Sequence, residues 1–310
     1  MSHAPLRIAT LVPAATDLIA ALGLADGIVA RSHECDHPLV ADRPVVTSSN
    51  VPAAGVGGDT DPAEVDAAVS ATLAEGGPLY TVDTDRLAEL EVDVVVSQTI
   101  CDVCAVRRDQ FDGELAEHVR VVDVTAVDLD GLRRDITELA AALGIPERAD
   151  ALIGSVDARV QTVRQRAAGR RRPAVATIEW TDPPFVGGHW VPEMVELAGG
   201  RHLLTSPGEA SRRCGWDDLL GTTGGDAAEI VLVLPCGYDL AGTVREAERL
   251  VAGPLAGSDA AVWALDANAL TSRCTAAYAT AVETIAAIVA GEKPAPGTAV
   301  CVREAAGATS

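Results

Sequence analysis

The sequence predicts an α/β protein built from two lobes, and three observations lead there. Short apolar runs rich in valine and isoleucine alternate with segments of helical character along most of the chain, which is the pattern of βα units. This alternation occurs twice, on either side of a stretch with helical spacing only. The length of 310 residues is long for one core but suits two lobes of about 120 to 150 residues each.

The first lobe, residues 1–127, opens as a βαβ unit. Thr16 or Asp17 can cap its first helix, and Gly23 can end it. Residues 47–62 are rich in Ser, Gly, Pro and Asp and predict a loop. The strands are expected at 7–12, 27–31, 92–97 and 120–124, and the helices at 18–22 and 61–73.

Residues 128–171 predict a helical connector. Apolar residues recur there at helical spacing, and Gly144-Ile145-Pro146 interrupts them. We therefore expect a shorter helix followed by a long one, with the arginines of 164–172 near its C-terminus.

The second lobe, residues 172–310, repeats the α/β style. A Pro/Gly/Ala-rich tail from Gly291 onward is expected to be mobile. The predicted strands are 174–179, 230–234 and 262–265, and the predicted helices are 192–197 and 276–290.

The formal net charge of −21 disfavours binding to nucleic acid and to anionic membranes. No apolar stretch is long enough to span a bilayer. No signal-peptide pattern precedes the first strand, so we expect a cytoplasmic protein. In that reducing compartment the 7 cysteines are not expected to form structural disulfides.

Four motifs follow predicted strands, where α/β proteins bind ligands. They gather thiols, imidazoles and carboxylates, so distant parts of the chain can meet in one cleft. The motifs are His33-Glu34-Cys35-Asp36, Cys101-Asp102-Val103-Cys104, Gly188-His189-Trp190-Val191-Pro192-Glu193 and Pro235-Cys236-Gly237.

The cysteines indicate a metal site or redox chemistry. Cys101 and Cys104 form a Cys-x-x-Cys pair that can chelate one ion, although two buried strand-end cysteines would look the same. With Cys35 and Cys236 they would supply the thiolates of a zinc site or an iron–sulfur cluster. His33 is a further candidate ligand, or a strand-end histidine satisfied by a hydrogen bond.

Carboxylates and aromatic rings come to the same region. Glu34, Glu179 and Glu193 can act in acid–base chemistry if the protein is an enzyme, although Glu193 also suits the first turn of a helix. Aromatic residues make up only 3% of the chain, yet three of them and a histidine cluster locally. We expect this cluster and one arginine to contact the ligand: Trp180, Phe185, His189, Trp190 and Arg273. Alternatively, the aromatic rings form a small satellite core under a loop.

The motifs together resemble a known family. A strand followed by Pro13-Ala14-Ala15-Thr16-Asp17 is similar to the opening of periplasmic-type binding proteins for cobalamin, iron chelates and metals. The cysteine and His-Trp motifs resemble the subgroup called cobalamin-binding proteins. The resemblance covers roughly residues 7–290, with two departures. The chain lacks an export signal, and it has Cys274 after Ser272-Arg273 where the family tends to have proline.

The resemblance implies two α/β lobes joined by one long helix, here around residues 147–167, with a ligand cleft between the lobes. It implies binding of a corrinoid, a metal chelate or a metal ion for storage, delivery or sensing. The missing signal does not favour a permease partner. The alternative hypothesis is a metalloenzyme on this fold with zinc or an iron–sulfur cluster. Nucleotide-binding and serine-hydrolase motifs are absent from the sequence.

Overall fold

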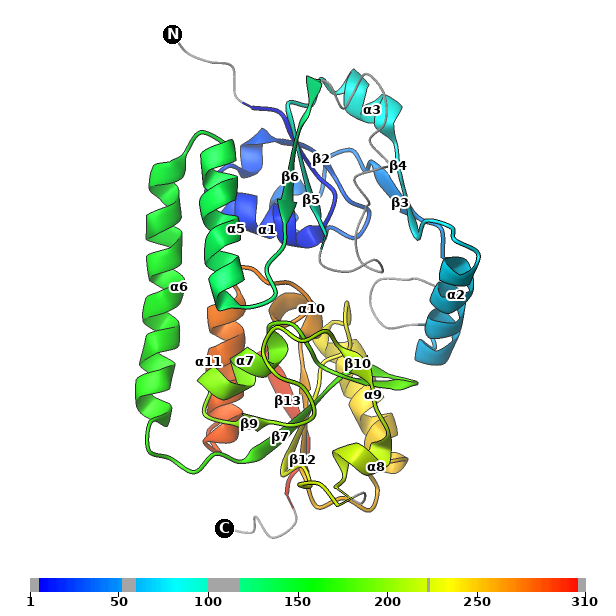
Figure 1. The fold of residues 1–310 in the computed structure, drawn as a ribbon, viewed down its shortest axis with the longest axis vertical. Coiled ribbons are helices and arrows are strands. Elements are labelled where there is room, and N and C mark those ends of the chain that lie inside the picture. Colours follow the sequence, from blue (N-terminus) through cyan, green and yellow to red (C-terminus); the bar gives the residue numbers. More distant parts are fainter. Residues whose placement is uncertain (1–5, 52–59, 100–117, 222–223, 306–310) are drawn as a thin grey trace. The chain divides into compact units, whose positions relative to one another are not determined.

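The computed structural model describes residues 6–51, 60–99, 118–221 and 224–305 (Figure 1). These residues form two compact units. The first comprises residues 6–51, 67–99, 118–126 and 130–154, and the second comprises residues 60–66, 127–129, 155–221 and 224–305. Both units are of the α/β type, as the sequence predicts.

The first unit is built on a parallel sheet with the strand order β2-β1-β5-β6. Val94, Val95 and Val96 lie beside the first strand and are buried, because covered parallel sheets need apolar residues on both faces. The four strands in the described residues are β1 (Ile8–Thr10), β2 (Ile28–Arg31), β5 (Val94–Gln98) and β6 (Arg120–Val124).

Helix α1 (Pro13–Ala21) packs against β1 and β5. It begins five residues before the predicted start, because proline suits the first turn, where its missing N–H has no partner to lose. Gly23 follows the helix with φ +76° and ends it as predicted. Helix α3 (Thr84–Glu89) places Leu87 in the core on the sheet.

The predicted loop at 47–62 needs a correction, because part of it is ordered. β3 (Thr47–Ser49) pairs antiparallel with β4 (Tyr80–Val82). The polar composition of 47–49 hides this strand, whose pairing partner lies far along the chain. Helix α2 (Pro62–Ala74) then begins where Asp61 and Pro62 predict it.

The predicted helical connector consists of α5 (Leu129–Ala142) and α6 (Pro146–Ala167). The division between the two units falls inside α6, between Gly154 and Ser155, so this one helix continues from the first unit into the second. Within the first unit, buried Asp135 of α5 accepts hydrogen bonds from the backbone of Thr125 and Ala126 at 2.8 and 2.9 Å. This carboxylate fixes the turn that follows β6.

The second unit contains a larger mixed sheet, with the order β10-β8-β7-β11-β12-β13 and β9 paired with β7. Its centre, β7-β11-β12, is parallel and buried. The seven strands in the described residues are β7 (Ala174–Thr181), β8 (Pro184–Val186), β9 (Arg201–His202), β10 (Arg212–Arg213), β11 (Ile230–Val233), β12 (Ala261–Leu265) and β13 (Ala299–Arg303).

The C-terminal tail also differs from the prediction. Residues 299–303 form β13, antiparallel to β12, with Trp263 opposite Cys301. The Gly/Pro-rich composition around this strand predicts a mobile segment. Pairing with the edge of β12 orders the strand nevertheless.

Helices cover both faces of this sheet (Figure 1). α9 (Leu240–Ala252) packs on β12 and β13, and α7 (Val191–Leu197) packs against α11 (Tyr278–Val289). Arg159 of α6 binds Glu283 of α11 through two contacts of 2.9 and 2.6 Å. Short helices α8 (Trp216–Leu219) and α10 (Ala267–Leu270) complete the unit among the described residues.

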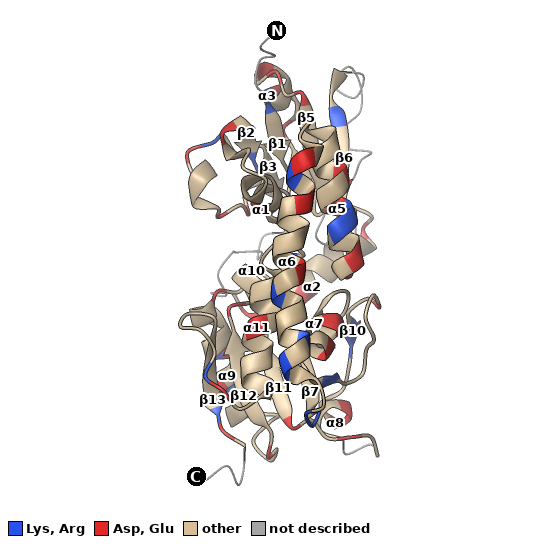
Figure 2. Cartoon of the chain, turned by 90° about the vertical axis from the view of Figure 1, so that its left-hand side faces the viewer, with Lys and Arg blue, Asp and Glu red and all other residues tan. Residues whose placement is uncertain are grey.

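Acidic residues recur on helices and loops of both units (Figure 2). No helix in the described part of the chain is both long enough and apolar enough to cross a membrane.

Candidate functional site

The candidate site in the second unit lies at the carboxyl ends of β7, β11 and β12. Hydrogen bonds join the loops that follow these three strands. Cys236 N donates to Glu179 O at 3.1 Å, and Gly237 N donates to Ser272 Oγ at 2.9 Å. Asn268 N donates to Tyr238 O at 2.9 Å. Parallel strands thus bring three distant segments to one edge of the sheet, as the sequence predicts.

A group of aromatic side chains lies at this edge of the sheet. Trp180 and Phe185 are opposite each other on β7 and β8, and both are partly exposed. The ring of Trp180 meets the ring of Tyr238 edge-on, with centroids 5.9 Å apart at 86°. Edge-to-face packing is a favourable aromatic arrangement, so Tyr238 supports Trp180 and leaves part of its surface open.

Trp190 has a different environment from Trp180. Its side chain is only 8% exposed, and its Nε1 donates to Thr271 O at 2.7 Å. A buried indole with a satisfied N–H anchors a loop. Trp190 therefore joins the loop after β8 to the segment after α10, and its ring offers little surface for stacking on a ligand.

His189 follows Gly187 and Gly188 and precedes Trp190 in the chain. Its backbone is in the left-handed region, with φ +52°. Its ring centroid is 5.8 Å from that of Trp190. Burial lowers the pKa of His189, so the imidazole is neutral at pH 7. A neutral imidazole nitrogen can coordinate a metal ion.

The loop that carries His189 is tightly packed. His189 N donates to Glu209 O, and Gly208 N donates to His189 O at 2.9 Å. A Cβ on Gly188 would overlap the backbone of Ala210 and Ser211. The glycine is therefore required by the close approach of two loops.

Glu179 is a predicted acid–base residue that the structure places in this loop packing. Its carboxylate accepts a hydrogen bond from Gly188 N at 3.1 Å and from Ser211 Oγ at 2.9 and 2.8 Å. These contacts show Glu179 holding two loops together.

Glu193 lies in the first turn of α7, where its Oε2 accepts hydrogen bonds from Tyr278 Oη at 2.8 Å and Leu129 N at 2.7 Å. Tyr278 is fully buried, and its burial, together with the adjacent carboxylate, raises the pKa of Tyr278. These contacts tie α7 to α11 and to the start of α5.

Cys236 and Arg273 also lie at this edge. Cys236 is exposed, and Gly237 after it has φ +81°. Arg273 is partly buried and donates to Asn268 Oδ1 at 2.7 Å.

The first unit has a polar cluster at the ends of its strands. Cys35 is 6% exposed, and its Sγ lies 3.3 Å from Thr16 Oγ1, which is 2.7 Å from Thr10 Oγ1. The thiol therefore points into the interior among hydroxyl groups.

His33 and Glu34 lie nearer the surface of that unit. His33 Nδ1 is 2.6 Å from Thr47 Oγ1, and its ring centroid is 5.7 Å from that of Tyr80. Tyr80 Oη donates to Glu34 Oε1 at 3.4 Å. Thr47 is a partner that the predicted loop at 47–62 could not reveal.

The predicted metal centre remains a prediction. Cys101 and Cys104 lie outside the described residues. Cys35 and His33 belong to the first unit, and Cys236 to the second. Within the described residues, no group of three or more His, Cys, Asp or Glu side chains is placed to hold a metal ion.

Sequence reasoning missed several residues that shape the site. Tyr238 follows the Cys236-Gly237 motif, and the scarcity of aromatic residues could have drawn attention to it. Further polar partners are Thr177, which lies inside a predicted strand, and His202, Thr205 and Thr271, which lie in segments without a predicted motif.

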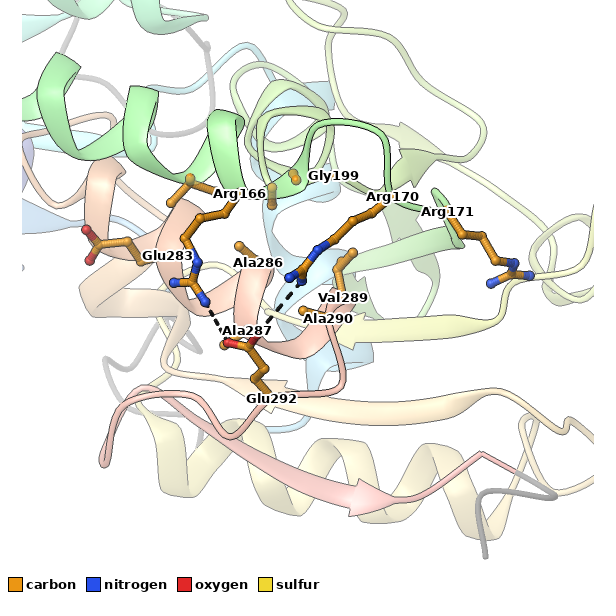
Figure 3. Close-up of a pocket in the computed structure, with 13 residues that line it drawn as sticks. Arg166, Arg170, Arg171, Gly199, Glu283, Ala286, Ala287, Val289, Ala290 and Glu292 are labelled. Carbon is orange, nitrogen blue, oxygen red and sulfur yellow. Dashed lines mark hydrogen bonds and ion pairs between the residues drawn. The ribbon is translucent and has the colours of Figure 1, made fainter. Parts of the chain in front are cut away.

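A separate small pocket of about 80 Å³ lies between α6, α11 and the end of α7 (Figure 3). Glu292 bridges Arg166 and Arg170 there at 2.9 and 3.8 Å. Arg171 pairs with Glu229 instead. The charged residues that line the pocket therefore form ion pairs, and the rest of its walls are mostly small apolar residues.

Two α/β units and one helix that continues from the first into the second are the elements of a two-lobed binding-protein fold. Residues 8–262 match the family described as periplasmic binding protein, and the chain belongs to this family. None of the curated proteins compared matches the chain.

Solved structures support the same fold. The periplasmic vitamin B12 binding protein BtuF of Vibrio cholerae is similar with a TM-score of 0.64 and 19% identity, over 92% of this chain and 97% of that chain. A periplasmic heme binding protein from Pseudomonas aeruginosa has a TM-score of 0.66 and 18% identity, over 94% and 95%. S. aureus IsdE, solved with heme, has a TM-score of 0.63 and 13% identity, over 92% and 99%.

Proposed function

We propose that this protein binds a corrinoid or a related metal chelate in the cytoplasm, for storage, delivery or sensing. The observation that carries the proposal is the strand-end group of the second unit, where the partly exposed rings of Trp180 and Phe185 accompany the neutral imidazole of His189. A flat macrocycle with a central metal matches both features. The similar folds of a periplasmic vitamin B12 binding protein and a periplasmic heme binding protein support this ligand class.

The residues have distinct proposed roles. Trp180 and Phe185 stack on the macrocycle, and His189 approaches its metal. Arg273 binds an acidic substituent of the ligand. Trp190 holds the loop through its bond to Thr271.

In the first unit, His33 and Cys35 stay predictions as metal ligands, and Glu34 stays a prediction as an acid–base group if the protein is an enzyme. A ligand cleft between the units is proposed, and variants on each unit test it. Loss of affinity from changes on both units would support a shared site.

The direct test is a spectroscopic titration of the purified protein with cobalamin and, separately, with heme. Trp180→Ala is expected to weaken binding by about fivefold or more, since stacking contacts of this kind are worth about 1–3 kcal/mol. Trp180→Phe keeps an aromatic face and is the matched control, with a smaller loss.

The metal contact has its own spectral signature. A visible-band shift on binding that is lost in His189→Ala would support coordination by the imidazole. Absence of binding to cobalamin, to heme and to other metal chelates of this type would overturn the proposed function.

A further inference from the structure

The peptide groups around Gly187 take part in a circuit of hydrogen bonds with three side chains from β7, β9 and the loop after β9. Gly187 N is 3.1 Å from Thr177 Oγ1, which is 2.8 Å from His202 Nε2. His202 Nδ1 is 3.1 Å from Thr205 O, and Thr205 Oγ1 is 2.6 Å from Gly187 O. We call these four residues the Gly187 circuit.

Donor and acceptor types assign every proton in the circuit. The carbonyl oxygen of Thr205 can only accept, and the Thr205 hydroxyl, 3.3 Å from Nδ1, already donates to Gly187 O. We therefore assign the His202 proton to Nδ1. Nε2 is then an acceptor and takes the hydroxyl proton of Thr177, whose oxygen accepts from Gly187 N. The Thr205 hydroxyl donates to Gly187 O, which closes the circuit in one direction.

The circuit is buried, which makes each of its bonds matter. Thr177 is 0% exposed, and His202 and Thr205 are each 8% exposed. A buried hydroxyl or imidazole without a partner is costly, whereas each satisfied group holds the next in place. Both polar groups of Gly187 therefore bond to buried side chains, and Gly187 N also donates to Thr177 O at 3.3 Å.

Gly187 directly precedes the segment that carries the proposed ligand contact. Gly188 N is held by Glu179, and His189 N is held by Glu209 O. His189 adopts the left-handed conformation, which a non-glycine residue adopts only when its surroundings impose it. The circuit fixes the peptide from which this conformation starts.

We propose that Thr177, His202 and Thr205 are positioning residues, which act through Gly187 to orient the imidazole of His189 toward the bound ligand. This inference rests on the proposed function for its ligand, but the circuit itself can be tested without any ligand.

The first experiment measures the circuit in the free protein. Long-range ¹H–¹⁵N correlation spectra of the labelled full chain report the tautomer of each histidine ring. His202 is expected as the Nδ1–H tautomer. An Nε2–H tautomer of His202 would overturn the assignment.

Hydrogen exchange tests the mechanical link. Thr177→Val keeps the shape of the side chain but removes its hydroxyl, and Thr177→Ser keeps the hydroxyl. The valine variant is expected to exchange the amides of residues 187–189 about tenfold faster than wild type, and the serine variant near the wild-type rate. Equal exchange in both variants would overturn the positioning role.

Binding then tests the action through His189. Thr177→Val is expected to weaken ligand binding by about tenfold. In a His189→Ala background the same change is expected to have little further effect, because the residue it positions is gone. Full additivity of the two losses would contradict action through His189.

These arms separate the two proposals. A protein that binds no corrinoid or heme but shows the expected tautomer and exchange pattern would overturn the function and keep the circuit. A protein that binds ligand but is insensitive to Thr177→Val would keep the function and overturn the positioning role.

Discussion

Glu179 illustrates how one residue can hold several segments of the site together. It lies in β7, two residues before the strand ends, near the edge where functional groups are expected. Its carboxylate accepts bonds from Gly188 and Ser211, so it joins two loops. Trp180, which is proposed to contact a ligand, is partly exposed, whereas Trp190, which anchors a loop, is buried.

His202 leads to a prediction about pH. Burial lowers the pKa of His202 from 6.5 to about 4. Well above pH 6.5 His202 is neutral in both the folded and the unfolded chain, so its titration does not lower the free energy of unfolding there. As the pH falls from 6.5 to 4, the unfolded chain takes up the proton first, so the folded state loses about 3 kcal/mol.

The measurement is the urea midpoint of wild type and of His202→Gln between pH 7 and pH 4. The many carboxylates contribute a background that both proteins share. The variant is expected to be less stable at pH 7 but to lose less on acidification. Parallel curves for the two proteins would contradict the prediction.

Helix α6 is an element that local sequence patterns predict well. Its apolar spacing, Pro146 at its start and its arginine-rich end predict it from the sequence alone. Helix α9 was missed, although Asp239 caps it by accepting from Gly242 N at 2.7 Å. Strands β3 and β13 were missed because each depends on a distant partner, which short local patterns do not contain.

Gly154 of α6 provides a test at this scale. It is exposed within the helix, and an added Cβ would contact nothing within 4 Å. Gly154→Ala is expected to raise the free energy of unfolding by about 0.5–1 kcal/mol, because alanine loses less backbone entropy on forming a helix.

Gly144→Ala is the matched comparison, since its added Cβ also meets nothing within 4 Å, but φ is +75°. This variant is expected to be less stable than wild type, because an L side chain is strained there. Chemical denaturation of both variants measures the difference, and destabilisation by Gly154→Ala would contradict the helix argument.

At the scale of the whole molecule, a metal ion or cluster bound by the protein is the prediction to test. The sequence predicts thiolate ligands at Cys101 and Cys104, and elemental analysis of protein purified without oxygen tests them. If a structural zinc or an iron–sulfur cluster is present, Cys101→Ser is expected to remove most of it and to lower the melting temperature. Chelation of the wild-type protein is expected to have the same effect.

Cys301→Ser is the control for that experiment, because Cys301 lies on β13 of the second unit, outside the predicted ligand set. Metal-free wild-type protein with unchanged stability in Cys101→Ser would reject both the metal site and the metalloenzyme hypothesis. The corrinoid proposal does not depend on this outcome.

Local patterns in the sequence predict the α/β class, the order of the main strands and helices, the long helix, and the placement of Glu179, Trp180 and Cys236 at or near the ends of buried strands. These features follow from local patterns and from the rule that parallel strands share one functional edge. Packing between distant segments sets which of these side chains stay exposed and which are buried and hold a loop in place. Those roles depend on contacts between distant residues, such as Ser211 with Glu179, 32 positions apart, and Trp190 with Thr271, 81 positions apart. Burial and hydrogen-bond partners arise only when such segments pack together.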